Sequence, residues 1–253
     1  MKFTIGCDPE VFLLQNGNIK SAIGLIGGNK QKPLKISEVG HYILEDNVAV
    51  EFNIPPCNSF ESFANEVEFT LNELKKKLNT YDFSTESALV FPDNELNTAD
   101  AWVFGCEPDY NAWTLQENEK PNCEEKNLRS AGGHIHVGSF IAQENPVETI
   151  KAMDLFLGVP SVNLDTNGKT RRQLYGNAGA CRLKPYGIEY RTLSNFWIFN
   201  KSLIKWAYEG TQKALEFVYN KNSISEEDGQ KIQNCINNGN MNDYEYLAKT
   251  YGL

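Results

Sequence analysis

Two of the chain's three histidines, His134 and His136, stand in the segment AGGHIHVG at residues 131–138, separated by one apolar residue and flanked by glycines. In a β-strand, residues two apart point to the same side, so both imidazoles would share one face. Imidazole is a common metal ligand, although a single H-x-H pair is more often structural or exposed than ligating. The other segments must decide between these interpretations.

The same two-residue spacing recurs in three other predicted strands. The side chains expected to share a face are Asp8 with Glu10, then Asn47, Ala49, Glu51 and Asn53, and then Glu189 with Arg191. Burying such groups without partners would be strongly unfavourable, so they face water or are neutralised. Hard divalent cations bind carboxylate oxygens and tolerate an imidazole, and two such ions can hold the phosphates of a nucleotide.

Arginines would complete such a site, because a planar guanidinium matches two phosphate oxygens at once. The segment from 171 to 191 contains Arg171, Arg172, Arg182 and Arg191. Plainer interpretations exist for each element: Asp8-Pro9 as a turn, Glu51 and Glu189 as solvent-side strand residues, and RRQLYGNAGACR as a basic loop. The common spacing on predicted strands favours the combined site.

Other catalytic motifs fail on inspection. The segment GLIGGNK at 24–30 resembles a phosphate-binding P-loop, but Asn29 replaces the second glycine and neither Ser nor Thr follows Lys30. The chain contains no G-x-S-x-G nucleophile motif.

The elements that must position these residues are mixed strands and helices. The N-terminal half predicts a hairpin around Asn16-Gly17, a strand at 47–54, a helix at 59–79 begun by a capping box of Asn58 and Glu61, and a strand at 86–91. Residues 115–130 are predicted to form a polar surface loop.

The C-terminal half is predicted to contain more helix. Its predicted elements are a helix at about 146–157, a strand at 187–193, a long amphipathic helix at 196–220, and two shorter helices marked by Ser225 with Asp228 and Asn242 with Glu245. This pattern predicts an α+β fold with a central antiparallel sheet in one domain, 1–253, of which 196–253 is a C-terminal helical part.

The amino-acid composition limits the classes of binding partner that we expect. A net charge of −9 and a pI near 5.0 provide no broad basic surface, which argues against nucleic acid and anionic membranes and favours small-molecule or protein partners. The six cysteines form no C-x-x-C pair, as expected in a reducing compartment. With no apolar signal region and no stretch near 20 apolar residues, a soluble cytoplasmic protein is expected.

Five segments in this order, DPE, VEFN, GGHIHVG, RRQLYGNAG and GIEYRTL, resemble the phage-type carboxylate-amine (COOH.NH2) ligases, relatives of glutamine synthetase and glutamate-cysteine ligase. The resemblance covers roughly residues 3–200. It implies a glutamine synthetase-like curved antiparallel sheet with helices packed on its convex side. Its concave face would bind ATP and two or more Mg²⁺ or Mn²⁺ ions, in the host cytoplasm if the protein is phage-encoded.

The resemblance also implies roles for the polar residues. Asp8 and Glu10 would each bind a different ion, and the relatives commonly have Glu where this chain has Asp8. The first ion would be completed by Glu51 with Asp46 or Glu45 upstream, although Asp46 is out of phase with Glu51 unless the strand bends. The second would be bound by Asp8, His134 and Glu189.

The remaining candidates concern the nucleotide and the transferred phosphoryl group. The residues expected to contact the nucleotide are His136, Arg171, Arg172 and Lys30, and those expected at the phosphoryl group are Arg182, Arg191 and Glu189. The stretch GCEPDYNAW at 105–113, with Trp113, is either part of the acceptor pocket or a packed turn.

The implied reaction is ATP-dependent amide formation through an acyl phosphate, with small-molecule or peptide acids and amines as substrates. Two alternatives remain: a non-catalytic nucleotide- or peptide-binding phage protein on the same fold, and a metal-dependent amide hydrolase. The sequence determines neither the acid and amine nor the oligomeric state.

Overall fold

The computed structural model describes residues 2–102, 109–119, 123–172 and 174–253. Its largest sheet is antiparallel, with the strand order β1-β13-β15-β14-β10-β11. The strands are β1 (Thr4–Cys7), β13 (Ile135–Gly138), β15 (Gly187–Tyr190), β14 (Ala180–Lys184), β10 (Tyr110–Asn111) and β11 (Gln116–Glu117). The predicted mixture of helices with antiparallel strands is confirmed.

A second sheet continues from the first through a break at Pro9. Its order is β2 (Glu10–Val11), β7 (Ala49–Asn53), β6 (Tyr42–Asp46) and β5 (Leu34–Lys35). Proline has no N–H to donate to a neighbouring strand, which interrupts the strand between β1 and β2. The backbone at the end of β7 hydrogen-bonds to the chain on both sides of Asp8. Phe52 donates to the Pro9 carbonyl (3.1 Å) and Ile54 to the Cys7 carbonyl (3.3 Å).

Register divides the main sheet into an apolar and a polar face. One row across β1, β13, β15 and β14 contains Gly6, His136, Glu189 and Arg182. The adjacent row contains Ile5, Val137 and Ile188, all buried in the largest core cluster. Because alternate side chains leave a strand on opposite faces, one face forms the core and the other collects polar groups.

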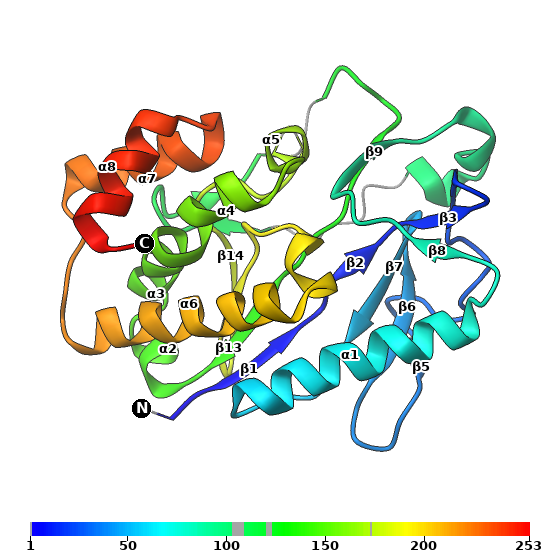
Figure 1. Ribbon diagram of the computed structural model, residues 1–253, viewed down its shortest axis with the longest axis horizontal. Coiled ribbons are helices and arrows are strands. Elements are labelled where there is room, and N and C mark those ends of the chain that lie inside the picture. The colour runs from blue at the N-terminus through cyan, green and yellow to red at the C-terminus, as the bar shows by residue number, and fades with distance from the viewer. Residues whose placement is uncertain (1, 103–108, 120–122, 173) are drawn as a thin grey trace.

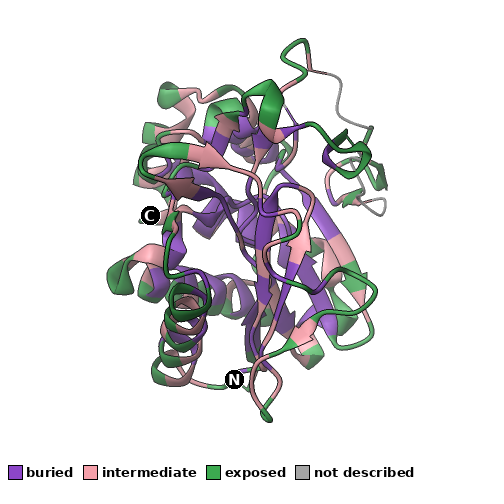
Figure 2. Ribbon diagram, turned by 90° about the vertical axis from the view of Figure 1, so that its right-hand side faces the viewer, coloured by how far each residue is buried: buried purple, intermediate pink, exposed green. Residues whose placement is uncertain are grey.

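Helices pack on the apolar face. In Figure 1, α1 (Phe60–Lys77) and α6 (Lys201–Tyr219) cross the same side of the strands, and α2 (Phe140–Glu144) and α3 (Pro146–Met153) contact β15 behind them. The strands through the middle of the molecule are largely buried, whereas the outer helical turns are exposed (Figure 2). No helix of the described residues is long and apolar enough to cross a membrane.

The remaining helices extend the C-terminal half. After α3 the chain continues through a π-helical segment (Asp154–Gly158) into α4 (Val159–Leu164) and α5 (Gly168–Arg171). Helices α7 (Glu226–Asn238) and α8 (Met241–Tyr251) pack against each other and against α4. They share a separate apolar cluster that includes Leu155, Ile232 and Leu247.

Short elements complete the fold around the sheets. The strands are β3 (Leu13–Gln15), β4 (Asn18–Lys20), β8 (Asp82–Phe83), β9 (Ala88–Val90) and β12 (Leu128–Ser130). Three 3-10 turns lie at Asp93–Glu95, Ala99–Trp102 and Asn195–Phe199. The hairpin predicted at Asn16-Gly17 is confirmed, since both residues have positive φ between β3 and β4.

Several predicted boundaries are wrong in detail. Helix α1 is capped by Ser59 with Ser62 rather than by Asn58 with Glu61, and α8 by Asn240 rather than Asn242. Asn47 does not share the face of Glu51, because it has φ 55° in the two-residue turn between β6 and β7. The helix expected at 146–157 runs on to Leu164, and the one expected from 196 starts at Lys201 after a 3-10 turn.

We predict that Gly133→Ala destabilises the fold strongly. A Cβ there would overlap the carbonyl oxygen of Ser194 and lie 2.7 Å from Nε1 of Trp197, both fixed by packing. Such overpacking costs roughly 3 kcal/mol or more, or about 6–12 °C in Tm. Gly6→Ala is the control, because its Cβ would approach nothing closer than 3.8 Å. Equal Tm changes for both variants, measured by thermal denaturation, would contradict the prediction.

Candidate active site

Among the described residues, two groups of possible metal ligands occur, which we name the first triad (Asp8, His134 and Glu189) and the second triad (Glu10, Asp46 and Glu51). In each triad one ligand atom per residue lies within 4.8 Å of the other two. Asp8 and Glu10 therefore belong to different triads, as the resemblance implies. They are separated by Pro9, at which the strand breaks.

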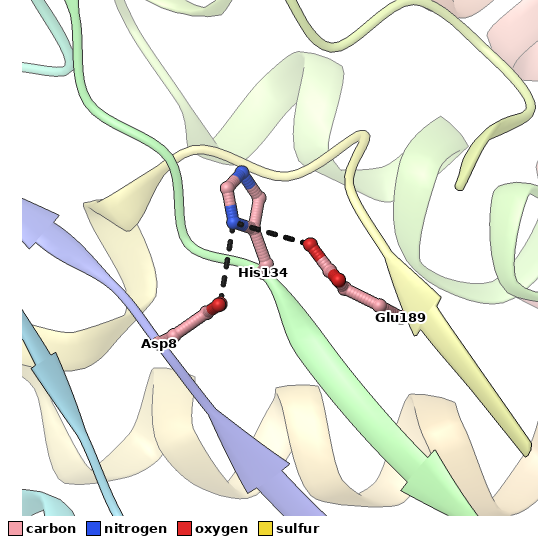
Figure 3. A group of neighbouring side chains, drawn as sticks. All are labelled: Asp8, His134 and Glu189. Atoms are coloured by element: carbon pink, nitrogen blue, oxygen red, sulfur yellow. Dashed lines mark ion pairs between the residues drawn. The ribbon is translucent and has the colours of Figure 1, made fainter. Parts of the chain in front are cut away.

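The first triad gathers side chains from three segments that are distant in sequence. Asp8 follows β1, His134 precedes β13, and Glu189 lies on β15, and all three point toward one another (Figure 3). His134 Nδ1 is 3.2 Å from Asp8 Oδ1 and 3.9 Å from Glu189 Oε1. The second oxygen of Asp8 lies 3.1 Å from Nε2 of His136, so Asp8 stands between both imidazoles.

The glycines around the histidines allow this placement. A Cβ at Gly132 would collide with the His134 ring, and Gly133 lies against the Ser194 backbone. Gly133 donates to the Leu193 carbonyl (3.0 Å) and accepts from Trp197 Nε1 (3.1 Å). The segment is thus fixed to the chain that follows β15, and His134 takes a set position beside Glu189.

Strand pairing builds the second triad. Glu10 and Glu51 are direct partners between β2 and β7. Asp46 pairs with Ala49 across the hairpin of β6 and β7, and Ala49 shares a face with Glu51. The two-residue alternation predicted that Asp46 and Glu51 point to opposite faces, because they are an odd number of residues apart. That prediction is wrong, because the chain reverses in the two-residue turn between β6 and β7 and the alternation does not continue through it.

Glu45 points away from the second triad and anchors a loop. Its carboxylate accepts the backbone N–H groups of Gly24 (3.0 Å), Ile26 (2.8 Å) and Gly27 (3.0 Å). This loop leads to Lys30, whose ammonium lies 2.9 Å from Asp46. The segment 24–30 therefore supports a lysine over the second triad rather than forming a P-loop.

The two triads differ in their electrostatics. Burial and the neighbouring Asp46 raise the pKa of Glu10 to about 7, and burial with Asp8, Asp46 and Glu10 raises that of Glu51 well above its usual value. Burial also works to raise the pKa of Asp8, but the imidazoles of His136 and His134 outweigh it and hold that pKa well below its usual value. Repulsion between carboxylates is therefore stronger in the second triad than in the first.

Glu189 is the most enclosed acid of the site and has several cationic neighbours. It forms ion pairs with Lys184 (2.8 Å), with Arg182 (3.5 Å) and with Arg191. Burial and Asp8 oppose its ionisation, yet His134 and Arg191 lower its pKa to about 2. Arg191 also pairs with Asp109 (3.3 Å), which fixes the guanidinium from its other side.

Sequence reasoning missed Lys184 and Asp109. Lys184 stands two residues after Arg182 on β14, so the spacing used elsewhere could have identified it. Asp109 had no such signal, because its contact with Arg191 joins residues far apart in sequence. Residues 105–108 of the GCEPDYNAW stretch, 120–122 of the 115–130 loop and Gln173 of RRQLYGNAG lie outside the described residues.

Other predicted residues lie further from the triads. Arg171 is buried and donates to the Thr192 (2.8 Å) and Arg191 (3.3 Å) carbonyls, so it holds the strand that carries Arg191. Arg172 donates to Ser161 (3.2 Å) and faces helix α4. Trp113 donates to Asp154 (2.7 Å) and packs in the cluster of α7, as in the packed-turn interpretation.

Two adjoining cavities open over the triads. The larger, about 410 Å³, is lined by both triads' Asp8, Glu10, Asp46, Glu51 and His134, together with Lys30, Arg182, Lys184 and Arg191. The smaller, about 70 Å³, shares Glu10, Lys30, Asp46, His134 and Arg191 and adds Phe12, Val48, Arg129, Arg171, Leu174 and Tyr175. A charged space thus adjoins a partly apolar one, within the size range of ligand sites.

The residues present fit divalent cations. Among the described residues, no donor has hydrogen-bonding geometry to the buried Oδ1 of Asp8, which faces His134 Nδ1 and Glu189. The donor set is oxygen with one imidazole nitrogen, which suits Mg²⁺ or Mn²⁺ better than softer metals. Five carboxylates at such distances would repel one another unless cations lay between them.

Two adjoining antiparallel sheets that bring the two triads to a cavity lined by cations define a candidate metal-dependent site for anionic ligands. Residues 127–220 match the sequence model of the family described as Phage phiEco32-like COOH.NH2 ligase-type 2. For that segment the resemblance is confirmed, and the family name indicates a ligase of the COOH.NH2 type. The segment contains His134, His136, Arg182, Glu189 and Arg191. No curated protein matches the chain.

We predict that Glu10→Gln stabilises the metal-free protein in a pH-dependent way. Since folding raises the pKa of Glu10 from 4.5 to about 7, the folded state binds more protons in that window, and stability falls as pH rises through it. Removing the charge should raise Tm at pH 8 by about 3–10 °C, or ~1–3 kcal/mol, and much less at pH 5.

Thermal denaturation at both pH values measures this effect. Glu209→Gln, on an exposed part of α6, is the control and should change Tm at neither pH. Saturating Mn²⁺ should remove the gain, because the cation neutralises Glu10 in the wild-type protein. A gain of the same size at pH 5 and pH 8 would count against repulsion as its cause.

We further predict different roles for two adjacent acids. Asp46→Asn should weaken Mn²⁺ binding at least about tenfold without lowering the Tm of the metal-free protein, because it removes a ligand and a repelling charge. Glu45→Gln should lower Tm by several degrees, since three backbone N–H groups lose a charged acceptor, ~2 kcal/mol in total. Calorimetric titration with Mn²⁺ would contradict this assignment if Glu45→Gln weakened binding more than Asp46→Asn.

Proposed function

We propose that this protein is an ATP-dependent ligase that joins a carboxylate to an amine through an acyl phosphate. The observation that carries the proposal is that the members of both triads except Glu189 line one cavity, which Lys30, Arg182, Lys184 and Arg191 also line. Such a cavity combines metal ligands with cations suited to phosphate. The family match over residues 127–220 supports the same chemistry.

The triads would hold the divalent ions, which when bound supply positive charge to phosphate oxygens. The first triad and the second would position them on either side of the Pro9 break. Arg182 and Arg191, which lie beside Glu189, would face the transferred phosphoryl group and stabilise the charge that spreads over its oxygens. Lys30 and His136 would contact the remaining phosphates, and the apolar part of the smaller cavity would take an uncharged part of a substrate.

In the first step, an oxygen of the acid substrate attacks the γ-phosphorus of ATP, and ADP leaves with the electrons of the broken P–O bond. In the second step, the amine attacks the carbonyl carbon of the acyl phosphate, and phosphate departs while the amine loses a proton. Activation is required because a free carboxylate is a poor electrophile. The acid and the amine would be small molecules or peptides.

We predict ATP-dependent trapping of the activated acid by hydroxylamine. Hydroxylamine replaces the unidentified amine, so a panel of amino acids and small peptides can be tested as acids with Mg²⁺ and ATP. The matching acid should yield a hydroxamate together with equal amounts of ADP and phosphate. Glu189→Gln should reduce this turnover about 100-fold, because it removes a carboxylate ligand of the ion that the first triad would hold.

The control for this experiment is Glu209→Gln, which leaves the site unchanged and should retain wild-type turnover. Wild-type protein that binds Mg-ATP but turns over no acid of the panel, with binding that persists in Glu51→Gln and Glu189→Gln, would indicate a non-catalytic binding protein instead. Amide hydrolysis that depends on Mn²⁺ and needs no nucleotide would indicate a hydrolase.

A further inference from the structure

Each triad has one lysine ion-paired to one of its acids. Lys30 Nζ lies 2.9 Å from Asp46 in the second triad, and Lys184 Nζ lies 2.8 Å from Glu189 in the first. The two lysines come from different parts of the chain, the segment before β5 and strand β14. Both line the charged cavity, so both ammonium groups occupy the side from which cations and anionic ligands would enter.

The charges of the site nearly balance in this arrangement. The two triads contain five carboxylates, and among the described residues four Lys or Arg side chains pair with them: Lys30, Lys184, Arg182 and Arg191. With these five carboxylates and Asp109, which also pairs with Arg191, all ionised, the acids exceed the four cations by two, and two divalent cations would turn that deficit into an excess of two. The loaded site would then need a polyanion, whereas the unloaded site would not.

The lysines and Arg191 differ in their freedom to move. The side chain of Arg191 is only 6% exposed and is held by Glu189 and Asp109. Those of Lys30 and Lys184 are 42% and 28% exposed. A flexible lysine stem can carry its ammonium group from one oxygen to another without disturbing the fold. The arginine is therefore the fixed cation of the site, and the lysines are the exchangeable ones.

We propose that Lys30 and Lys184 are exchangeable counterions, which neutralise the triads before metal binds and move to the anionic ligand afterwards. This inference rests on the proposed function for the identity of the ligand as a polyphosphate. In the absence of anion the ammonium groups compete with the divalent cations for Asp46 and Glu189. Once the divalent cations and the polyphosphate are bound, the displaced ammonium groups pair with phosphate oxygens. The cations and the polyphosphate therefore strengthen each other's binding.

The test is a pair of titrations on Lys30→Met and Lys184→Met, which keep an unbranched side chain one atom shorter and remove its charge. The first probe is Mn²⁺ alone in a phosphate-free chloride buffer, followed by calorimetry and by the electron spin resonance signal of free Mn²⁺. The second probe is the preformed complex of Mn²⁺ with inorganic tripolyphosphate. Removing one competing charge at a few ångströms should tighten binding of Mn²⁺ alone about tenfold and weaken binding of the complex about tenfold.

Two further variants separate this effect from general damage. Lys20→Met is the matched control, because Lys20 forms an ion pair of similar length (2.7 Å) with the half-buried Glu95 and lines neither cavity. It should change neither affinity. Lys184→Arg keeps the charge and should bind Mn²⁺ alone no more tightly than the wild-type protein, which keeps the test decisive if Lys184→Met folds poorly.

Opposite changes for the two probes support exchangeable counterions. Changes in the same direction, unchanged affinities, or an absence of Mn²⁺ binding in all variants would overturn the inference. The ligase proposal is tested separately. If the affinities for the two probes change in opposite directions but no hydroxamate forms, the ligase proposal is wrong and the counterion role still holds. Conversely, if hydroxamate forms but the lysine variants bind Mn²⁺ with unchanged affinity, the counterion proposal is wrong and the ligase proposal still holds.

Discussion

Repulsion among five carboxylates gathered from two adjoining sheets is the constraint that organises this protein. Asp8, Glu10, Asp46, Glu51 and Glu189 lie in two groups whose ligand atoms are within 4.8 Å of one another. Burial adds to the repulsion, because it removes the water that would screen it. The surrounding lysines, arginines and histidines are arranged to relieve this repulsion, and the raised pKa of Glu10 and Glu51 indicates that they relieve the second triad incompletely.

The fold tolerates this polar face because its opposite face is apolar. Ile5, Val137 and Ile188 lie in the row next to the one that contains His136 and Glu189, and helices cover them. Packing on the helical side thus stabilises strands whose other side would be unfavourable alone. The break between β1 and β2 at Pro9 also separates the acids on either side of it, so that Asp8 and Glu10 enter different triads.

The site combines fixed and movable charges. Arg191 is held between Glu189 and Asp109, and Arg171 holds the backbone that carries Arg191. Lys30 is presented by a loop that Glu45 anchors through three backbone N–H groups. Rigid guanidinium groups suit the stabilisation of a transition state, and flexible ammonium groups suit the exchange of ligands.

The sequence alone determined which side chains share a strand face, because the two-residue period is a local property of the backbone. It therefore identified Asp8, Glu10, Glu51, His134, Glu189 and Arg191 as candidates and predicted the hairpin at Asn16-Gly17 and the approximate helices, but it wrongly placed Asn47, which lies in a turn, on the face of Glu51. It could not determine contacts that depend on how strands pair and turn. The placement of Asp46 with Glu51, the outward turn of Glu45, and the contacts of Lys184 and Asp109 were decided only by the tertiary structure, since register and loop closure join residues that no local spacing relates.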